Sequence, residues 1–486
     1  MRRLEILCPV IFLLALVRVE FSTAATITVG PNDCSAPTVN SAISSANPGD
    51  TVKLICTGTV NWTNTVTVSG GVELIGPGSM STNSWPLVID CSGGTQQPVI
   101  QITNASNQPL NRVSGLEFQN YVNTSGYLIW ATGQGLGPSP YYGAYRIDNN
   151  YFNSINQVCR LMWLDSSAGE MTGLVDHNVI YDSEQIAPIE SYAPTGLSLG
   201  QDAWDRPLNL GDAHALFIES NQWIVDNNGG WYSTGLEAPH GAGAKFVYRY
   251  NTWNCSKSFT TDFAGGHGPD IGNCGGVTGT RSMEIYGNTG TFSSSCYAGI
   301  TIRSGTALVY NNAATSGQMY AGLWEDRAST SEIVGLDWPS LNYYKPCKQA
   351  PQISDFATCW PLPYGISACG SISGAHGGAG NVSSQCVGTL GTTFWNNSFA
   401  PGASNDGPNQ TYVTLNREYW NASSGPQANL PATCTADGNT YYGTTDTNQL
   451  YKCTATDVWT LVYTAYTYPH PLTNDIQPPD GLRLLQ

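Results

Sequence analysis

Basic and imidazole side chains, the residue types that move protons, gather in one stretch of the chain. Lys245 and Arg249 stand in the segment KFVYR, both at an even distance from Asn251, so on a strand they should project from the same face. At about 3.3 Å per residue they would lie roughly 13 Å apart, which suits two adjacent subsites of a polymer better than one proton transfer. His240 and His267 flank this segment, and histidine is a natural base near neutral pH. The candidate catalytic residues are therefore Lys245, Arg249, His240, His267, Arg281 and Arg303.

A row of acidic residues is a second candidate for chemistry. Asp148, Asp176 and Glu219 each stand two residues before an asparagine, and Arg249 occupies the same place before Asn251. On neighbouring strands, about 4.8 Å apart, three carboxylates repel one another unless a cation joins them. Calcium, which takes oxygen ligands, would serve, and Arg249 is the alternative counter-charge. The sequence thus predicts either a metal site of Asp148, Asp176 and Glu219 or a charge-balanced polar face.

Aromatic residues crowd the same region. The strand register places Trp223 and Trp253 in the core, whereas Trp204, Trp231 and Tyr232 fall in loops, where their rings could stack on sugars. Nearby acidic residues could supply the paired carboxylates of a glycoside hydrolase, but the sequence does not fix which would pair. They are Asp202, Asp205, Glu237, Asp262 and Asp270. The candidate substrate-binding residues are Trp204, Trp231, Tyr232 and Glu237.

All these candidates depend on a short repeated segment that ends in asparagine. The six asparagines are 28, 43, 30, 37 and 24 positions apart, namely Asn150, Asn178, Asn221, Asn251, Asn288 and Asn312. Short β-rich runs joined by variable loops are typical of a solenoid that stacks one coil on the next. Asparagine suits a sharp coil corner because it tolerates the left-handed backbone conformation, and its amide can bond the next asparagine in a ladder.

The alternation within each copy sets the direction of the side chains. Mostly apolar residues stand three positions before the asparagine, namely Ile147, Val175, Ile218, Tyr248, Ile285 and Val309. Polar or aromatic residues stand two positions before it, namely Asp148, Asp176, Glu219, Arg249, Tyr286 and Tyr310. Because successive side chains of a strand point to opposite faces, we expect the first set to form one inward stack and the second to point to solvent.

The repeat predicts an all-β fold, a right-handed parallel β-helix. A short amphipathic helix over residues 35–46 would cap its N-terminal end, since a solenoid needs its open end covered. We expect a signal peptide over residues 1–25, the β-helix over 26–324, irregular disulfide-braced loops and last coils over 325–430, and a small β-hairpin unit with a C-terminal tail over 431–486.

The N-terminal sequence predicts export. Two arginines precede an apolar run of about a dozen residues and a small-residue site at residues 22–25, the pattern of a cleaved signal peptide that is too short to span a bilayer. In an oxidising compartment most cysteines should pair, and we expect the local pairs Cys434 with Cys453 and Cys34 with Cys56. The expected protein is secreted, either extracellular or periplasmic, and has no membrane span.

The charge balance restricts the partners. The formal net charge is −16 and the sequence has no basic stripe, so we do not expect nucleic-acid binding. An acidic polymer would be repelled at long range, and its binding would need a local basic patch or calcium.

Several segments resemble secreted right-handed parallel β-helix proteins of the pectate-lyase superfamily. They are TITVG, SAISSANPGDTVKL, TVTVSGGVELIGPG and the coils VYRYNTW, EIYGNT and LVYNN, and the resemblance covers residues 26–320. GAKFVYRYNTW and the final YTYPHPL look like a little-characterised bacterial branch. The superfamily includes lyases for several uronate polymers, glycoside hydrolases, epimerases and proteins with no known activity, so the resemblance implies the fold more sharply than the chemistry.

For chondroitinase- and alginate-lyase-like β-helices, the resemblance implies a lysine base and an arginine acid, with calcium or another cation opposing the uronate carboxylate. A lyase needs these functions because it removes a proton next to that carboxylate. We therefore expect a secreted polysaccharide lyase that acts on a uronate-containing polymer by β-elimination. Two alternatives stay open: a glycoside hydrolase on the same fold, and a non-catalytic cell-surface or matrix protein that binds glycans or other cells. The sequence leaves the polymer and the oligomeric state open.

Overall fold

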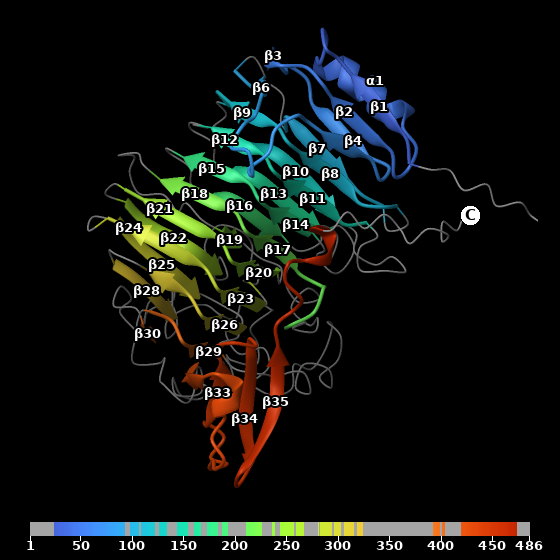
Figure 1. Cartoon of the computed structure of the whole chain (residues 1–486). Coiled ribbons are helices and arrows are strands. Elements are labelled where there is room, and N and C mark those ends of the chain that lie inside the picture. Colours follow the sequence, from blue (N-terminus) through green and yellow to red (C-terminus); the bar gives the residue numbers. More distant parts are fainter. Residues whose placement is uncertain are drawn as a thin grey trace, which may run out of the picture.

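Three long parallel sheets form the body of the protein. Successive strands pass in turn through sheets that we name A, B and C, and each coil stacks on the one before it (Figure 1). Their strand pairings are parallel, so the expected right-handed parallel β-helix is confirmed. The computed structural model describes residues 24–92, 98–105, 108–121, 126–133, 143–153, 160–166, 173–182, 187–192, 210–225, 236–238, 244–256, 259–266, 280, 282–293, 296–302, 306–314, 318–323, 392–398, 401–403 and 419–473.

Each sheet takes one strand from nearly every coil. In the described chain, sheet A contains β1 (Thr26–Val29), β2 (Thr51–Leu54), β5 (Glu73–Ile75), β8 (Asn111–Ser114), β11 (Tyr145–Asp148), β14 (Gly173–Asp176), β17 (Leu216–Glu219), β20 (Lys245–Arg249), β23 (Ser282–Tyr286), β26 (Thr306–Tyr310), β29 (Thr392–Trp395) and β31 (Tyr419–Asn421). Sheet B contains β3 (Gly58–Asn61), β6 (Leu87–Asp90), β9 (Glu117–Gln119), β12 (Tyr151–Asn153), β15 (Val179–Asp182), β18 (Gln222–Val225), β21 (Thr252–Cys255), β24 (Thr289–Phe292) and β27 (Ala313–Ala314). Sheet C contains β4 (Val66–Ser69), β7 (Ile100–Thr103), β10 (Tyr127–Gly133), β13 (Arg160–Ser166), β16 (Ala187–Tyr192), β19 (Leu236–Ala238), β22 (Phe259–Gly266), β25 (Cys296–Ile302), β28 (Gln318–Leu323) and β30 (Pro401–Ala403).

The predicted inward stack is confirmed. Six side chains from successive strands of sheet A pair in one register and are fully buried, namely Ile147, Val175, Ile218, Tyr248, Ile285 and Val309. Trp223 and Trp253 lie in the core as expected, with their rings stacked 4.9 Å apart. The period of two along each strand therefore sets which residues fill the interior.

The asparagine ladder at the corner between sheets A and B is also confirmed. Each side-chain amide donates to the side-chain oxygen of the next asparagine at 2.9–3.2 Å, in the order Asn150, Asn178, Asn221, Asn251, Asn288, Asn312 and Asn397. Each amide also donates to a backbone carbonyl of the preceding coil, such as that of Val175 for Asn221. The ladder thus satisfies buried polar groups at a corner where the β-ladders are interrupted.

The left-handed residue of this corner is not the asparagine of the ladder, as the sequence had suggested, but the residue before it. Positive φ angles occur at Asn149, His177, Ser220, Tyr250, Gly287, Asn311 and Asn396. The ladder asparagines point inward and are mostly buried, while the preceding residues make the sharp turn at the surface. In the coil of β8, Gly115 makes this turn, and Leu116 takes the place of the ladder asparagine, with its backbone N–H donating to Asn150.

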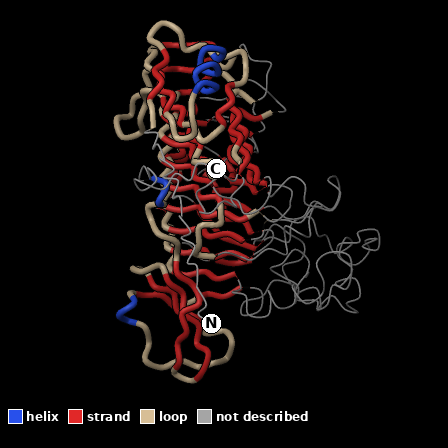
Figure 2. The backbone as a smooth tube through the Cα atoms, turned by 90° about the vertical axis from the view of Figure 1, so that its right-hand side faces the viewer, coloured by secondary structure: helices blue, strands red, loops and turns tan. Residues whose placement is uncertain are grey.

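The N-terminal end is capped as predicted. Helix α1 (Ala36–Ser45) buries Val39 and Ile43 against the first coils. The expected disulfide between Cys34 and Cys56 joins this cap to the chain that follows β2. The cap therefore covers the open end of the apolar core (Figures 1 and 2).

The described C-terminal part contains last coils of the β-helix and a separate sheet. β29, β30 and β31 add coils within residues 325–430, where last coils were expected, and Asn397 extends the ladder. A hairpin lies within residues 431–486, and it belongs to a larger sheet of β32 (Ser423–Gly425), β33 (Tyr441–Thr444), β34 (Gln449–Ala455) and β35 (Val458–Thr464), which we name the C-terminal sheet. The predicted Cys434–Cys453 disulfide braces it.

After β35 the chain turns back along the outside of sheet A. Residues 465–473, which we name the strap, run from β29 toward β11 and end in the short 3₁₀ helix Pro471–Thr473 (Figure 1). The strap and the C-terminal sheet enclose a second apolar cluster on the outer face of sheet A, which includes Phe217, Val247, Leu308, Tyr463 and Leu472. The strap and the C-terminal sheet together form a cover over that face.

The ladder predicts a measurable cost for one amide. Replacing Asn221 with Ala removes the two amide N–H donors that contact the carbonyls of Val175 and Glu219 and the side chain of Asn251, and it removes the oxygen that accepts from Asn178. We therefore expect chemical denaturation to show a loss of about 2–4 kcal/mol. Asn254, which is exposed on β21, is the matched control, and its replacement by Ala should change stability by less than about 0.5 kcal/mol. Equal effects of the two replacements would contradict a structural ladder.

Candidate functional site

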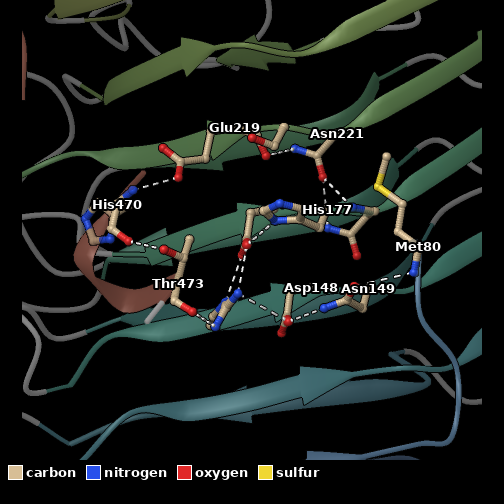
Figure 3. Close-up of polar contacts among 12 residues, drawn as sticks. Met80, Asp148, Asn149, His177, Glu219, Asn221, His470 and Thr473 are labelled. Atoms are coloured by element: carbon tan, nitrogen blue, oxygen red, sulfur yellow. Dashed lines mark hydrogen bonds and ion pairs between the residues drawn. The ribbon is translucent and has the colours of Figure 1, made fainter. Parts of the chain in front are cut away.

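The acidic row of sheet A has the predicted register but not the predicted exposure. Asp148, Asp176, Glu219 and Arg249 pair in order across β11, β14, β17 and β20, on the outer face of the sheet. We expected this row to meet solvent, and that expectation is wrong, because all four side chains are fully buried. The cover encloses Glu219 and Arg249, with the backbone N–H of His470 donating to Glu219 at 2.8 Å (Figure 3).

Arginines balance the two aspartates of this row. Arg112 donates two hydrogen bonds to Asp148 at 2.7–2.8 Å, and Arg146 donates two to Asp176 at 2.9 Å. Burial disfavours the charge on Asp176, but hydrogen bonds from His177 and Arg146 outweigh it and lower the pKa of that carboxyl. The repulsion that motivated a calcium site is therefore already met by protein charges, and no group suited to a metal occurs among the described residues.

Arg249 is wholly committed to the fold. Its five N–H groups meet the Glu219 carboxylate twice, the Tyr286 hydroxyl, and the backbone carbonyls of Tyr466 and Thr467, all at 2.6–2.9 Å. Burial works against its charge, but Tyr286 and Glu219 outweigh burial and raise its pKa. A guanidinium has five donors, so Arg249 has none left for a substrate.

Two arginines that are not among the predicted site residues complete this network. Arg112 and Arg146 stand four residues before the position of the ladder, with the same parity as the acidic row. That parity was a usable signal for a charge-balanced face. The contact with the strap could not be predicted from this pattern. There the backbone carbonyls of Leu472 and Thr473 accept hydrogen bonds from Arg146.

Lys245 is also buried, at the start of β20. The expectation that it projects into solvent beside Arg249 is therefore wrong. The other predicted catalytic residues, His240, His267, Arg281 and Arg303, lie outside the described residues, as do Trp204, Trp231 and Tyr232.

Sheet C presents a different row. Trp130 and Trp163 occupy paired positions on β10 and β13, and both side chains are half-buried on the outer face. The alternating neighbours Ile129 and Met162 are fully buried, so the two tryptophans face away from the core. The ring of Tyr127 lies 5.1 Å from that of Trp163. Three aromatic rings from two adjacent coils thus form one cluster at the surface.

The same row continues into acidic positions. Trp163 pairs with Glu190 on β16, and Glu190 pairs with Glu237 on β19. Glu237 is one of the predicted substrate-binding residues, and its pairing with Glu190 could not be predicted because 47 positions separate the two. The register therefore brings two aromatic and two acidic positions into one row across four adjacent strands of sheet C (Figure 1).

Three strands of sheet C end side by side next to this row. Ala238, Gly266 and Ile302 are paired last residues of β19, β22 and β25. Two predicted catalytic residues follow directly in the sequence, His267 after Gly266 and Arg303 after Ile302. Sheet C, rather than sheet A, is therefore the candidate functional face.

Known proteins share little sequence with this chain. No protein-family model and no curated protein matches the chain. Among solved structures it is similar to an alginate lyase from Paenibacillus sp. str. FPU-7, with 14% identity, a TM-score of 0.30, and coverage of 62% of this chain and 99% of that one. It is also similar to the PL6 family alginate lyase AlyGC, with 11% identity, a TM-score of 0.34, and coverage of 93% of this chain and 58% of that one. At these values the similarity does not assign a reaction or a substrate.

The buried pair of Arg249 and Glu219 yields a stability prediction. Replacing Arg249 with Met leaves Glu219 buried without its counter-charge and frees two strap carbonyls, so we expect a loss of about 3–5 kcal/mol in chemical denaturation. Adding Glu219→Met to the same chain should recover much of that loss. A loss of turnover at unchanged stability would instead assign Arg249 a catalytic role.

Proposed function

We propose that the protein binds a polysaccharide along the outer face of sheet C and cleaves it there by β-elimination. The observation that carries this proposal is the row of Trp130, Trp163, Glu190 and Glu237 on four adjacent strands. It combines surface aromatic rings with acidic positions on a long, regular face.

The aromatic cluster supplies the binding part. The faces of Trp130 and Trp163 are large and rigid, and such rings bind the apolar faces of sugars while their polar edges stay wet. Adjacent coils repeat about every 4.8 Å, so successive side chains meet an extended polymer at regular intervals. A chain lying along the row from β10 would reach the acidic positions on β16 and β19.

The strand ends beside Glu237 supply the proposed chemistry. A lyase needs a base for the proton next to the uronate carboxylate and a positive group that opposes this carboxylate. We assign these roles to His267 and Arg303, because the strands that precede them end in register at Gly266 and Ile302. Lys245 and Arg249 are left out of the mechanism because both are buried in sheet A.

Calcium fits this proposal at sheet C better than at sheet A. Glu190 and Glu237 are neighbours in the register, and carboxylate oxygens are the ligands that calcium prefers. Bound calcium would oppose the charge of a uronate, which matters in a protein with a net charge of −16.

A glycoside hydrolase is the second candidate, and the same pair favours it. Glu190 and Glu237 stand on adjacent strands, whose backbones lie about 4.8 Å apart, and the two carboxyl groups of a retaining hydrolase stand about 5–5.5 Å apart. One would then act as acid and base and the other as nucleophile.

We also propose that the protein is exported. The Cys34–Cys56 and Cys434–Cys453 disulfides are compatible with an oxidising compartment, where such bonds persist. Among the described helices, none is long and apolar enough to cross a membrane.

Binding on sheet C can be tested with one tryptophan. Trp163→Ala should weaken the affinity for a uronate polymer about tenfold, because one aromatic ring that stacks on a sugar is lost. Trp459→Ala, on β35 far from the row, should leave the affinity unchanged. Titration calorimetry with both variants, after a melting curve to verify folding, gives the comparison, and equal affinities would place the binding face elsewhere.

The reaction is tested by incubating the full chain with alginate, pectate and chondroitin, with and without calcium. β-Elimination should give the ultraviolet absorbance of an unsaturated product, which His267→Ala should reduce at least 100-fold without loss of folding. If reducing ends are released without that absorbance, and if Glu237→Gln abolishes their release, the result would favour hydrolysis. If the polymer binds but no product forms, the proposed cleavage would be contradicted, and the result would favour a non-catalytic glycan-binding protein.

A further inference from the structure

One buried carboxyl of sheet A, that of Glu284, has no arginine bonded to it among the residues that the structure describes. Glu284 lies on the outer face of β23, in register between the buried side chains of Val247 and Leu308. Its oxygens accept hydrogen bonds from the Tyr463 hydroxyl and from the backbone N–H of Gly211, the latter at 2.8 Å. Both donors are neutral, unlike the arginines that hold Asp148, Asp176 and Glu219.

Glu284 joins three separate parts of the chain. Tyr463 belongs to β35 of the C-terminal sheet, and its hydroxyl also lies 3.0 Å from that of Tyr310 on β26. Gly211 belongs to the segment before β17 and packs closely on the Thr464 carbonyl. The carboxyl is thus a contact point between the β-helix, the segment at residue 211 and the cover.

The charged and titratable groups around Glu284 do not offset a full negative charge at close range. Arg249 on β20 attracts it, but its hydrogen bonds go to other groups, and Asp212 repels it. Among the described residues, the hydroxyls of Tyr286 on its own strand, Tyr310 on β26 and Tyr463 on β35 lie near it. Lys245 on β20 pairs with Ser282, two residues before Glu284, and no hydrogen bond joins it to that carboxyl. Ionisation therefore places a carboxylate whose hydrogen-bond donors are neutral in a buried interface.

We propose that Glu284 is a pH-sensitive latch, which holds the C-terminal sheet against sheet A when it is protonated and loosens it when it is ionised. The strap end of the cover is held differently, since Arg146 and Arg249 keep their charge across this range. The response of Glu284 acts at the β35 end, where Tyr463 and Gly211 bond to it. Opening there would bring the buried outer residues Val247, Leu308 and Tyr310 into contact with water.

The direction of the pH dependence follows from burial. Burial raises the pKa of Glu284 from 4.5 to about 7, against the opposing effect of its hydrogen bonds. In the open state the carboxyl meets water and titrates near 4.5. The equilibrium constant for docking of the C-terminal sheet onto sheet A is therefore at its maximum below pH 4.5. It falls by up to tenfold per pH unit between pH 4.5 and 7, and it levels off above pH 7 after a total decrease of about 300-fold.

Hydrogen exchange of the Gly211 amide tests the latch, because this amide donates to Glu284 itself. The measurement is protection by mass spectrometry on the full chain, relative to the intrinsic rate at each pH. The expected result is a fall of up to about 300-fold between pH 4.5 and 7, with no further fall to pH 8 and no change in β11. A flat profile at Gly211 would overturn the proposal.

Two variants separate the latch from general loosening. Glu284→Gln keeps the shape without the charge, so its protection should stay high and independent of pH. The matched control Glu117→Gln, on β9 of sheet B, should keep the wild-type response. An unchanged pH response in Glu284→Gln would overturn the proposal. If that variant fails to fold, Tyr463→Phe serves instead, because it keeps the carboxyl and removes one hydrogen-bond donor that favours its ionised form. The fall in Gly211 protection should then occur at higher pH than in the wild type. A protection profile that is flat, or that falls at the wild-type pH, would overturn the proposal.

Discussion

The structure depends on one constraint, that each coil finds its backbone hydrogen-bond partners only in the coils above and below it. Every corner must therefore repeat in the same place, and the asparagine ladder meets this requirement between sheets A and B. The turn is made by a left-handed residue whose side chain stays at the surface, so the type of that residue varies from Asn to His, Ser, Tyr and Gly. The following asparagine points inward, where its amide is needed, and does not vary over seven coils.

Burial of Glu219 and Arg249 on the outer face of sheet A involves the cover, because strap groups bond to both side chains. Asp148, at the other end of the row, is enclosed by the side chains of Arg112, Arg146 and Asn149. Beneath the cover, Glu219 and Arg249 form an ion pair and hydrogen bonds that fix where the strap lies. Buried ion pairs add little net stability compared with apolar packing, because desolvation offsets their attraction. We interpret them as determinants of position, with the strap carbonyls as the groups that only the correct placement can satisfy.

Sheet C presents half-buried tryptophans on its outer face at β10 and β13, in register with the acidic positions of β16 and β19. The latch at Glu284 belongs to sheet A, so its titration and the chemistry of sheet C are separable by experiment.

The sequence by itself determined the features that repeat locally. Alternation along each strand placed Ile147, Ile218 and the rest of their stack inside, and the recurring asparagine marked the corner, because both patterns are set by the geometry of a few consecutive residues. The two short-range disulfides were predictable for the same reason. Only the tertiary structure decided that Arg249 is buried, since its partners at Tyr466 and Thr467 are 217 and 218 residues away. It also decided the row on sheet C, because 33, 27 and 47 residues of variable loop and strand separate Trp130, Trp163, Glu190 and Glu237, and only the pairing of coils brings them into register.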